Sequence, residues 1–171
     1  MKLFVIAAIF VSVTSTFGQS KQTKFADYPT AKYRGRIHNP KWIKRVKGGE
    51  WRDDLGKLVS DPYINFAGKY FVAVHSLGTG ARYYSMTDLS TGRESDLLGR
   101  FSTIEPIPKL RDGREFLTVI YVRPKSQLVV VQYLIDYMNK PDPECRERSF
   151  LFENRKIKAL TKVSYHCREL D

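Results

Sequence analysis

The stretch FLTVIYVRPKSQLVVVQYLIDY, residues 116–137, decides the fold class of this chain. Its two ends are rich in β-branched and aromatic residues, which favour strands. Between them lies a five-residue loop, residues 123–127, whose Pro124 has no N–H to donate to a sheet and so belongs in a turn. Residues 128–137 show almost no alternation of apolar and polar side chains, which is typical of a strand buried on both faces. The stretch predicts a hairpin whose second strand, with residues 129–131, lies near the middle of a sheet.

Similar runs occur on both sides of this hairpin. Residues 69–77 (KYFVAVHSL) lead into a Gly-rich turn at residues 78–80, and residues 82–88 (RYYSMTD) follow, so the two runs are expected to pair as antiparallel strands. Residues 149–152 and 157–165 supply a last hairpin. The strands follow one another along the chain, which favours a meandering antiparallel sheet.

One helix is expected to pack on this sheet, over about residues 50–60. Four apolar side chains recur there at a helical spacing: Trp51, Leu55, Leu58 and Val59. The helix would end at Asp61, because the residue before a proline disfavours the helical conformation. The predicted fold class is therefore α+β and mainly β, a meandering antiparallel sheet with one packed amphipathic helix.

The chain begins with a stretch typical of a secretory signal peptide, residues 1–20. Lys2 gives a positive start, residues 3–13 are almost wholly apolar, and small residues suited to cleavage follow at Thr16, Gly18 and Ser20. The apolar run is shorter than the stretch of about 20 residues that a transmembrane helix needs, so no transmembrane segment is expected in the mature chain. We expect an exported protein, periplasmic or secreted, with a basic extended arm at residues 21–48 and a single β-rich domain at residues 49–171.

The chain is strongly basic, with 29 Lys and Arg against 18 Asp and Glu and a net charge of +11. The excess is concentrated in a basic segment, residues 32–47, where Trp42 lies among Lys32, Arg34, Arg36, Lys41, Lys44, Arg45 and Lys47. Such a segment is typical of a solvated arm, and its aromatic residues are also typical of an anion-binding interface. The charge predicts an acidic protein or an anionic envelope component as partner. No nucleic acid is expected for an exported chain.

Cys145 and Cys167 are the two cysteines, and an even pair in an exported chain favours a disulfide. A turn at residues 153–156 would fold two strands back and bring both cysteines near the open end of one hairpin. A perfect register about this turn places Cys145 opposite Ser164, so the bridge requires a bulge or a longer entry loop. The competing interpretation, a metal site that includes His166, lacks a fourth ligand.

No arrangement of residues in the sequence identifies a reaction, and a protein that is not an enzyme is favoured. The three histidines do not occur in a metal-binding spacing, so neither a metal nor a cofactor is expected. His75 is followed by Ser76, but neighbouring strand residues point to opposite faces and cannot form a nucleophile–base pair. Residues 78–80 lack the Lys-Ser or Lys-Thr of a phosphate-binding loop and favour a hairpin turn. The possible acid pairs lie in or beside turns, where acids are usually solvated: Glu94 with Asp96, and Glu105 with Asp112.

Residues 63–93 resemble a pattern found in a family of exported bacterial proteins. The motif NFAGKY at residues 65–70 matches the strand start Asn-Phe-Ala-Gly-(His or Lys)-Tyr of that family, and a Gly-rich turn and the motif DLSTG at residues 88–92 follow as they do there. Members carry two cysteines around the Gly-rich turn, where this chain has Leu77 and Ala81, so no bridge is implied at that place. The resemblance implies export and a β-rich fold, and it implies no activity.

These patterns together favour an exported, non-catalytic binding protein, an inhibitor or immunity-type protein that acts on an envelope-directed enzyme. The basic segment and one loop would contact the partner, and the loop residues are His75, Leu77, Gly78, Thr79 and Gly80. The first alternative is a module that binds an anionic cell-envelope polymer or a lipid head group. The second alternative is a small periplasmic hydrolase, which requires a concave pocket where His75 or an acid pair meets other polar groups.

Overall fold

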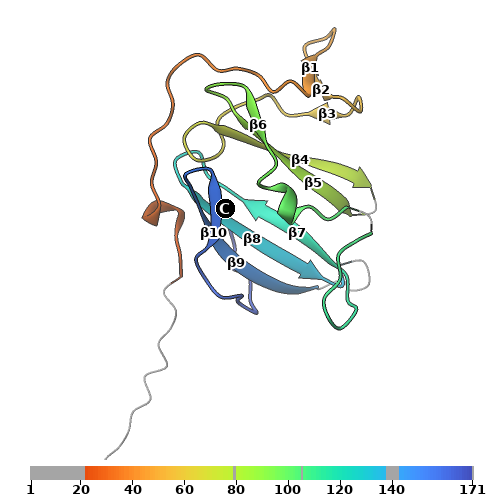
Figure 1. Cartoon of the computed structure of the whole chain (residues 1–171). Coiled ribbons are helices and arrows are strands. Elements are labelled where there is room, and N and C mark those ends of the chain that lie inside the picture. The colour runs from red at the N-terminus through yellow and green to blue at the C-terminus, as the bar shows by residue number, and fades with distance from the viewer. Residues whose placement is uncertain (1–21, 79, 105, 138–142, 171) are drawn as a thin grey trace, which may run out of the picture.

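The computed structural model describes residues 22–78, 80–104, 106–137 and 143–170, so the signal peptide predicted at residues 1–20 lies outside it. The described residues form three antiparallel sheets (Figure 1). The first sheet holds β1 (Ile43–Arg45), β2 (Trp51–Asp53) and β3 (Leu58–Val59). The second holds β4 (Tyr70–Gly78), β5 (Ala81–Asp88) and β6 (Arg93–Ser95). The third has the order β10-β9-β8-β7 and consists of β7 (Phe116–Tyr121), β8 (Leu128–Ile135), β9 (Glu144–Glu153) and β10 (Lys156–Ala159). The helical elements of these residues are two single turns of 3-10 helix, η1 (Phe25–Asp27) and η2 (Gly99–Phe101).

β8 is the strand that the sequence predicted for the middle of a sheet, and the structure confirms this prediction. It pairs with β7 on one side and with β9 on the other. The side chains of residues 128–131 are fully buried. Burial of one such aliphatic side chain contributes about 1.5–3 kcal/mol, so this strand supplies a large part of the apolar core.

The second and third sheets pack face to face around one core (Figure 1). Strands β5, β8 and β9 contribute Tyr84, Met86, Val129, Val131, Phe150 and Phe152 to it, and Phe66, Tyr70 and Phe101 add further large side chains. The Tyr84 hydroxyl also donates a buried hydrogen bond of 2.6 Å to the backbone carbonyl of Thr118 in β7. The chain is therefore mainly β, as predicted, with its strands divided between packed layers.

The prediction of one meandering sheet was wrong. After β6 the chain passes through η2 and then through Pro106 and Pro108, which have no N–H to offer a ladder. β7 consequently starts a new sheet, and the apolar faces of β5 and β8 meet by packing rather than by hydrogen bonding.

The helix predicted over about residues 50–60 was also wrong, because β2 and β3 occupy that region. Asp53 determines the local structure, since its Oδ1 atom accepts the N–H groups of Leu55 at 3.0 Å and of Lys57 at 2.8 Å. Side-chain hydrogen bonds of this kind offer the backbone an alternative to the helix. Gly56 then closes the turn at a φ of +76°. The apolar spacing produces no buried face, because Leu55 and Leu58 are 63% and 65% exposed.

In the described part of residues 21–48, η1 lies against the third sheet and Pro29 pairs with Ser126, and the chain then passes the second sheet before it forms β1 (Figure 1). The N–H of Tyr33 donates to the carbonyl of Gly68 at 2.7 Å, and the N–H of His38 donates to that of Leu89 at 2.8 Å. A Cβ atom at residue 68 would lie 2.0 Å from the carbonyl oxygen of Ala31, so this close approach of two backbones requires glycine.

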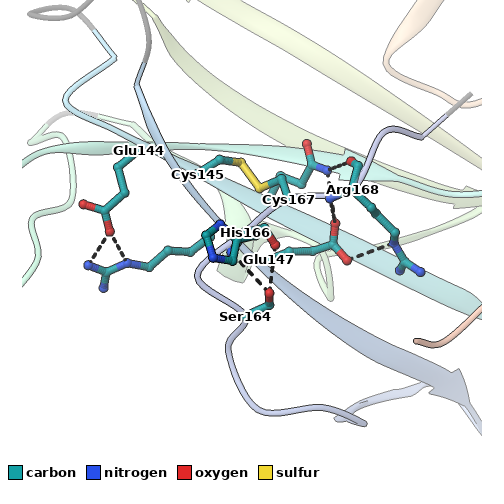
Figure 2. Close-up of a disulfide and its surroundings, with 9 residues drawn as sticks. Glu144, Cys145, Glu147, Ser164, His166, Cys167 and Arg168 are labelled. Atoms are coloured by element: carbon teal, nitrogen blue, oxygen red, sulfur yellow. Dashed lines mark hydrogen bonds and ion pairs between the residues drawn. A yellow bond between two sulfur atoms is a disulfide. The ribbon is translucent and has the colours of Figure 1, made fainter. Parts of the chain in front are cut away.

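The disulfide between Cys145 and Cys167 is present, as the sequence predicted (Figure 2). The two Cα atoms are 5.6 Å apart. β9 and β10 keep the register of a two-residue turn, but beyond β10 the register shifts by two residues and Ser164 pairs with Glu147. This shift is the irregularity that the bridge requires.

A buried ion pair holds the chain after the disulfide against the third sheet (Figure 2). An oxygen of Glu147, a residue of β9, lies 2.9 Å from Nε of Arg168. Gln132 of β8 donates to the same carboxylate at 3.1 Å. Arg168 also donates to the backbone carbonyl of Thr23 and so connects the two ends of the described chain.

Removal of the disulfide should destabilise the protein. The bridge spans a separation of 22 residues, and closing a loop of that size restricts the unfolded chain and contributes about 3 kcal/mol. We expect the double variant Cys145→Ser/Cys167→Ser to lose about this free energy of unfolding in urea titrations. Wild-type protein with dithiothreitol should behave like the variant. Equal stability of the variant and the oxidised wild type would contradict this assignment.

Candidate functional site

A concave pocket lies between the first sheet and the hairpin of β4 and β5. Its volume is about 220 Å³, and we call it the His75 pocket. Its lining residues are Trp42, Asp53, Asp54, Leu55, His75, Tyr83, Ser85 and Glu94. Convergence of several polar groups in one concavity is typical of a binding or catalytic site.

The central contact of the pocket joins His75 of β4 to Ser85 of β5. The Nε2 atom of His75 lies 2.9 Å from the hydroxyl oxygen of Ser85, which is hydrogen-bond distance. The strand register explains the contact: His75 is opposite Tyr83, and Ser85 follows two residues later on the same face. The adjacent Ser76 is exposed and lies on the other face, as the sequence argument required.

Asp53 approaches the other nitrogen of the same imidazole. Its Oδ2 atom is 3.6 Å from Nδ1 of His75, which is too long for a hydrogen bond but within ion-pair distance. The Asp53 side chain is 5% exposed. Its second oxygen is already held by two backbone N–H groups in the turn after β2. The carboxylate is therefore fixed by its own turn and directed at His75.

The imidazole of His75 contacts two aromatic rings. Tyr83 stacks on it at a centroid distance of 4.2 Å, and Trp42 meets it edge-on at 4.7 Å. Burial lowers the pKa of His75 below its usual value, and Lys57 lowers it as well, whereas the nearby Asp53 carboxylate raises it. A lowered pKa keeps the imidazole neutral at physiological pH, and a neutral Nε2 accepts a proton from a hydroxyl group.

Two nitrogen atoms of the pocket residues are buried without a hydrogen-bond partner in the part of the chain that the structure describes. They are Nε1 of Trp42 and Nδ1 of His75. Buried polar groups nearly always find a partner, so such exceptions require an explanation. The indole N–H of Trp42 is a donor that a ligand oxygen would satisfy.

The predicted loop residues lie at the end of β4 and the start of β5. His75 is 5% exposed and lines the pocket, whereas Leu77 is 43% exposed and is not one of its lining residues. Gly78 and Gly80 have φ values of +87° and +84°, which suit a tight turn between the two strands. Thr79 lies outside the described residues.

The basic segment divides into a cationic outer side and an aromatic inner side. Its cations are exposed: Lys32, Arg34, Arg36, Lys41, Lys44, Arg45 and Lys47. Trp42 turns inward onto His75, and Ile43 is 5% exposed. The structure thus brings Trp42 and His75, which the sequence placed in two separate binding segments, into direct contact.

Of the acid pairs considered from the sequence, the described residues include both Glu94 and Asp96 but only Asp112 of the second pair. Glu94 and Asp96 both line a neighbouring pocket of about 470 Å³ together with Ser85, and Glu94 also lines the His75 pocket. Asp112 forms an exposed ion pair with Arg114, and Glu105 lies outside the described residues. The described chain holds no group of three or more His, Cys, Asp and Glu placed to bind a metal ion, and none of its helices is long and apolar enough to span a membrane.

Sequence reasoning missed Asp53, Tyr83 and Ser85 as site residues. Asp53 lies within residues 50–60, where the sequence predicted a helix. Tyr83 and Ser85 alternate along residues 82–88, so the strand pattern does place them on one face. The pattern does not reveal that His75 shares this face, because that depends on the register between β4 and β5.

Comparisons with protein-family models, with curated proteins and with solved structures found no match to this chain. The function must therefore be argued from the His75 pocket and the charges around it.

The lowered pKa of His75 should make stability depend on pH. The folded state resists protonation of this imidazole and the unfolded state does not, so the free energy of unfolding should fall as the pH drops below about 6.5. We expect the loss between about pH 7.5 and about pH 5.5 to be smaller in His75→Gln than in the wild type. The control variant His166→Gln changes an exposed histidine and should keep the wild-type loss. An equal loss in His75→Gln would show that His75 does not cause it.

Proposed function

We propose that the protein is a small exported hydrolase of carboxylic esters that uses Ser85 as nucleophile and His75 as general base. The observation that carries the proposal is the distance of 2.9 Å between His75 Nε2 and the Ser85 hydroxyl at a concave pocket. Asp53, 3.6 Å from the opposite nitrogen, would position the imidazole and stabilise its charged form. Many hydrolase sites consist of a nucleophile that contacts a base and a carboxylate that orients this base.

The proposed reaction proceeds in two steps. The Ser85 oxygen attacks the ester carbonyl carbon while its proton passes to Nε2 of His75. The bond from the carbonyl carbon to the alcohol oxygen breaks, and His75 returns the proton to the leaving alcohol. Water then attacks the acylated Ser85, giving its proton to His75, and the carboxylic acid leaves as Ser85 regains that proton.

Trp42 would assist by binding the ester carbonyl oxygen. Its buried Nε1–H lacks a partner in the described structure and belongs to a residue of the pocket lining. A carbonyl oxygen that gains negative charge during attack is a stronger acceptor than the ground-state ester. A hydrogen bond to it would therefore favour the transition state.

Export is part of the proposal. Residues 1–20 have the character of a signal peptide, and the Cys145–Cys167 bridge is compatible with an oxidising compartment. An enzyme in that location would meet esters of the cell envelope or of the surroundings.

The nucleophile can be tested with a fluorophosphonate probe, which reacts covalently with activated serines. We expect the probe to modify Ser85, identified by peptide mass spectrometry, and 4-nitrophenyl acetate to be hydrolysed. Ser85→Ala and His75→Gln should each reduce hydrolysis by at least about 100-fold. Ser76→Ala, next to His75 in the chain but exposed on the other face, should retain it.

The same experiment separates a reactive site from a structural one. In Asp53→Asn the pH of half-maximal labelling should move downward, because the carboxylate that raises the pKa of His75 is gone. Absence of labelling in folded wild-type protein would overturn the proposal and would make Asp53, His75 and Ser85 contacts that fasten the first sheet to the second.

The second candidate function is binding without chemistry, as an inhibitor or immunity-type protein of an envelope-directed enzyme. The exposed cations of residues 32–47 favour it, because Trp42 of the same segment contacts His75 of the predicted loop. The partner would be an acidic protein. A module for an anionic envelope polymer or lipid head group is the related alternative, and it would use the same cations.

Salt dependence distinguishes these partners. Wild-type protein should be retained on immobilised polyphosphate at about 50 mM salt and released by about 500 mM, because exposed charges are screened. Replacement of Lys32, Lys41, Lys44 and Lys47 by Ala should weaken retention more than replacement of Lys125, Lys156, Lys158 and Lys162, all exposed lysines outside the basic segment. A protein partner that stays bound at about 500 mM salt would favour the inhibitor, and equal retention of the two variants would contradict binding through the basic segment.

A further inference from the structure

The charge lining the His75 pocket is opposite in sign to the charge of the protein. The chain has a net charge of +11. The pocket is nevertheless lined by three carboxylates, Asp53, Asp54 and Glu94, and by no Lys or Arg. Asp53 is occupied by His75 and by its own turn, whereas Asp54 and Glu94 are exposed and available to a ligand.

Two cations close to Asp53 and Asp54 in the chain, Lys57 and Arg52, bind other groups. Lys57 donates to the backbone carbonyl of Ser76 at 2.6 Å. Arg52 bonds the carbonyl of Gly56 at 2.7 Å and pairs with Glu50 at 3.0 Å. Lys57 is close enough to lower the pKa of His75, but it is not a lining residue. The pKa of Tyr83 is raised mainly by burial and further by the charges of Asp53 and Asp54, which agrees with a negative potential at the pocket.

The aromatic lining suits a cation as well. Trp42 and Tyr83 both line the pocket, and each contacts the His75 ring. A cation close to the face of such rings gains about 0.5–2 kcal/mol, and tryptophan is the strongest of the aromatic residues in this respect. Aromatic rings next to carboxylates are a common means of recognising alkylammonium groups.

We propose that the ester accepted by the His75 pocket carries an ammonium group, which Asp54 and Glu94 bind beside Trp42 and Tyr83. The proposal rests on the proposed hydrolase function and names its substrate class. The indole N–H of Trp42, buried without a partner in the described structure, would bind the ester carbonyl oxygen of the same substrate. The ammonium group would offset the repulsion between the carboxylates, and the ester carbonyl would face Ser85.

The test compares two esters of equal shape that differ only in charge. These are acetylcholine and 3,3-dimethylbutyl acetate, in which carbon replaces the charged nitrogen. We expect kcat/KM to be about 5–30-fold higher for the cationic ester, as a cation–π contact and exposed carboxylates would provide. In Asp54→Asn/Glu94→Gln this ratio should fall towards one. Asp61→Asn removes an exposed carboxylate outside the pocket and should keep the ratio.

A binding measurement separates this proposal from the hydrolase function. Phenyltrimethylammonium should quench tryptophan fluorescence of Ser85→Ala, and the Asp54→Asn/Glu94→Gln changes in that background should weaken the binding. Hydrolysis of both esters at equal rates, without this binding, would overturn the ammonium proposal and leave the hydrolase standing. Binding of the cation without hydrolysis of either ester would overturn the hydrolase and keep the cation site.

Discussion

Burial of β8 is the constraint on which the rest of the structure depends. The strand is covered on both edges by β7 and β9, and residues 128–131 are fully buried. Its apolar side chains require a second layer, which the face of β5 with Tyr84 and Met86 provides. The bond from the Tyr84 hydroxyl to the Thr118 carbonyl then fixes the two layers relative to each other. A polar group buried at such an interface is stable because it is paired.

Because one face of the β4–β5 hairpin packs on the third sheet, its other face points away from that sheet. A second apolar cluster covers that face, with Ile64, Phe71, Ala73 and Leu89 in contact with Tyr33 and Trp42. His75, Tyr83 and Ser85 continue the same face towards the turn, where the cover is the first sheet with Asp53. The imidazole is therefore shielded from water by aromatic rings yet adjacent to a pocket, and this combination keeps it neutral and within reach of a hydroxyl group.

Positive charge is concentrated in the basic segment, whereas the His75 pocket is lined by carboxylates. The cations of residues 32–47 are exposed, while Trp42 and Ile43 of the same segment turn inward. Long-range attraction of an anionic partner and local recognition of a cationic group are thus compatible, because the first depends on the summed field and the second on contacts of a few ångströms.

Local composition was enough to predict β4, β5 and β7 to β10, the buried position of β8 and the Cys145–Cys167 bridge, but not β1, β2, β3 or β6. β-branched runs, absent alternation and an even cysteine pair act through short-range preferences and chain geometry. The same reasoning predicted a helix at residues 50–60 that does not form, because the Asp53 side chain competes for the backbone donors that a helix would use.

The tertiary structure alone decided the site. Asp53, His75 and Ser85 come from three strands, and their contact depends on the register of β4 with β5 and on the docking of the first sheet. Strand register and sheet docking are set by burial summed over whole faces, which no short stretch of sequence contains.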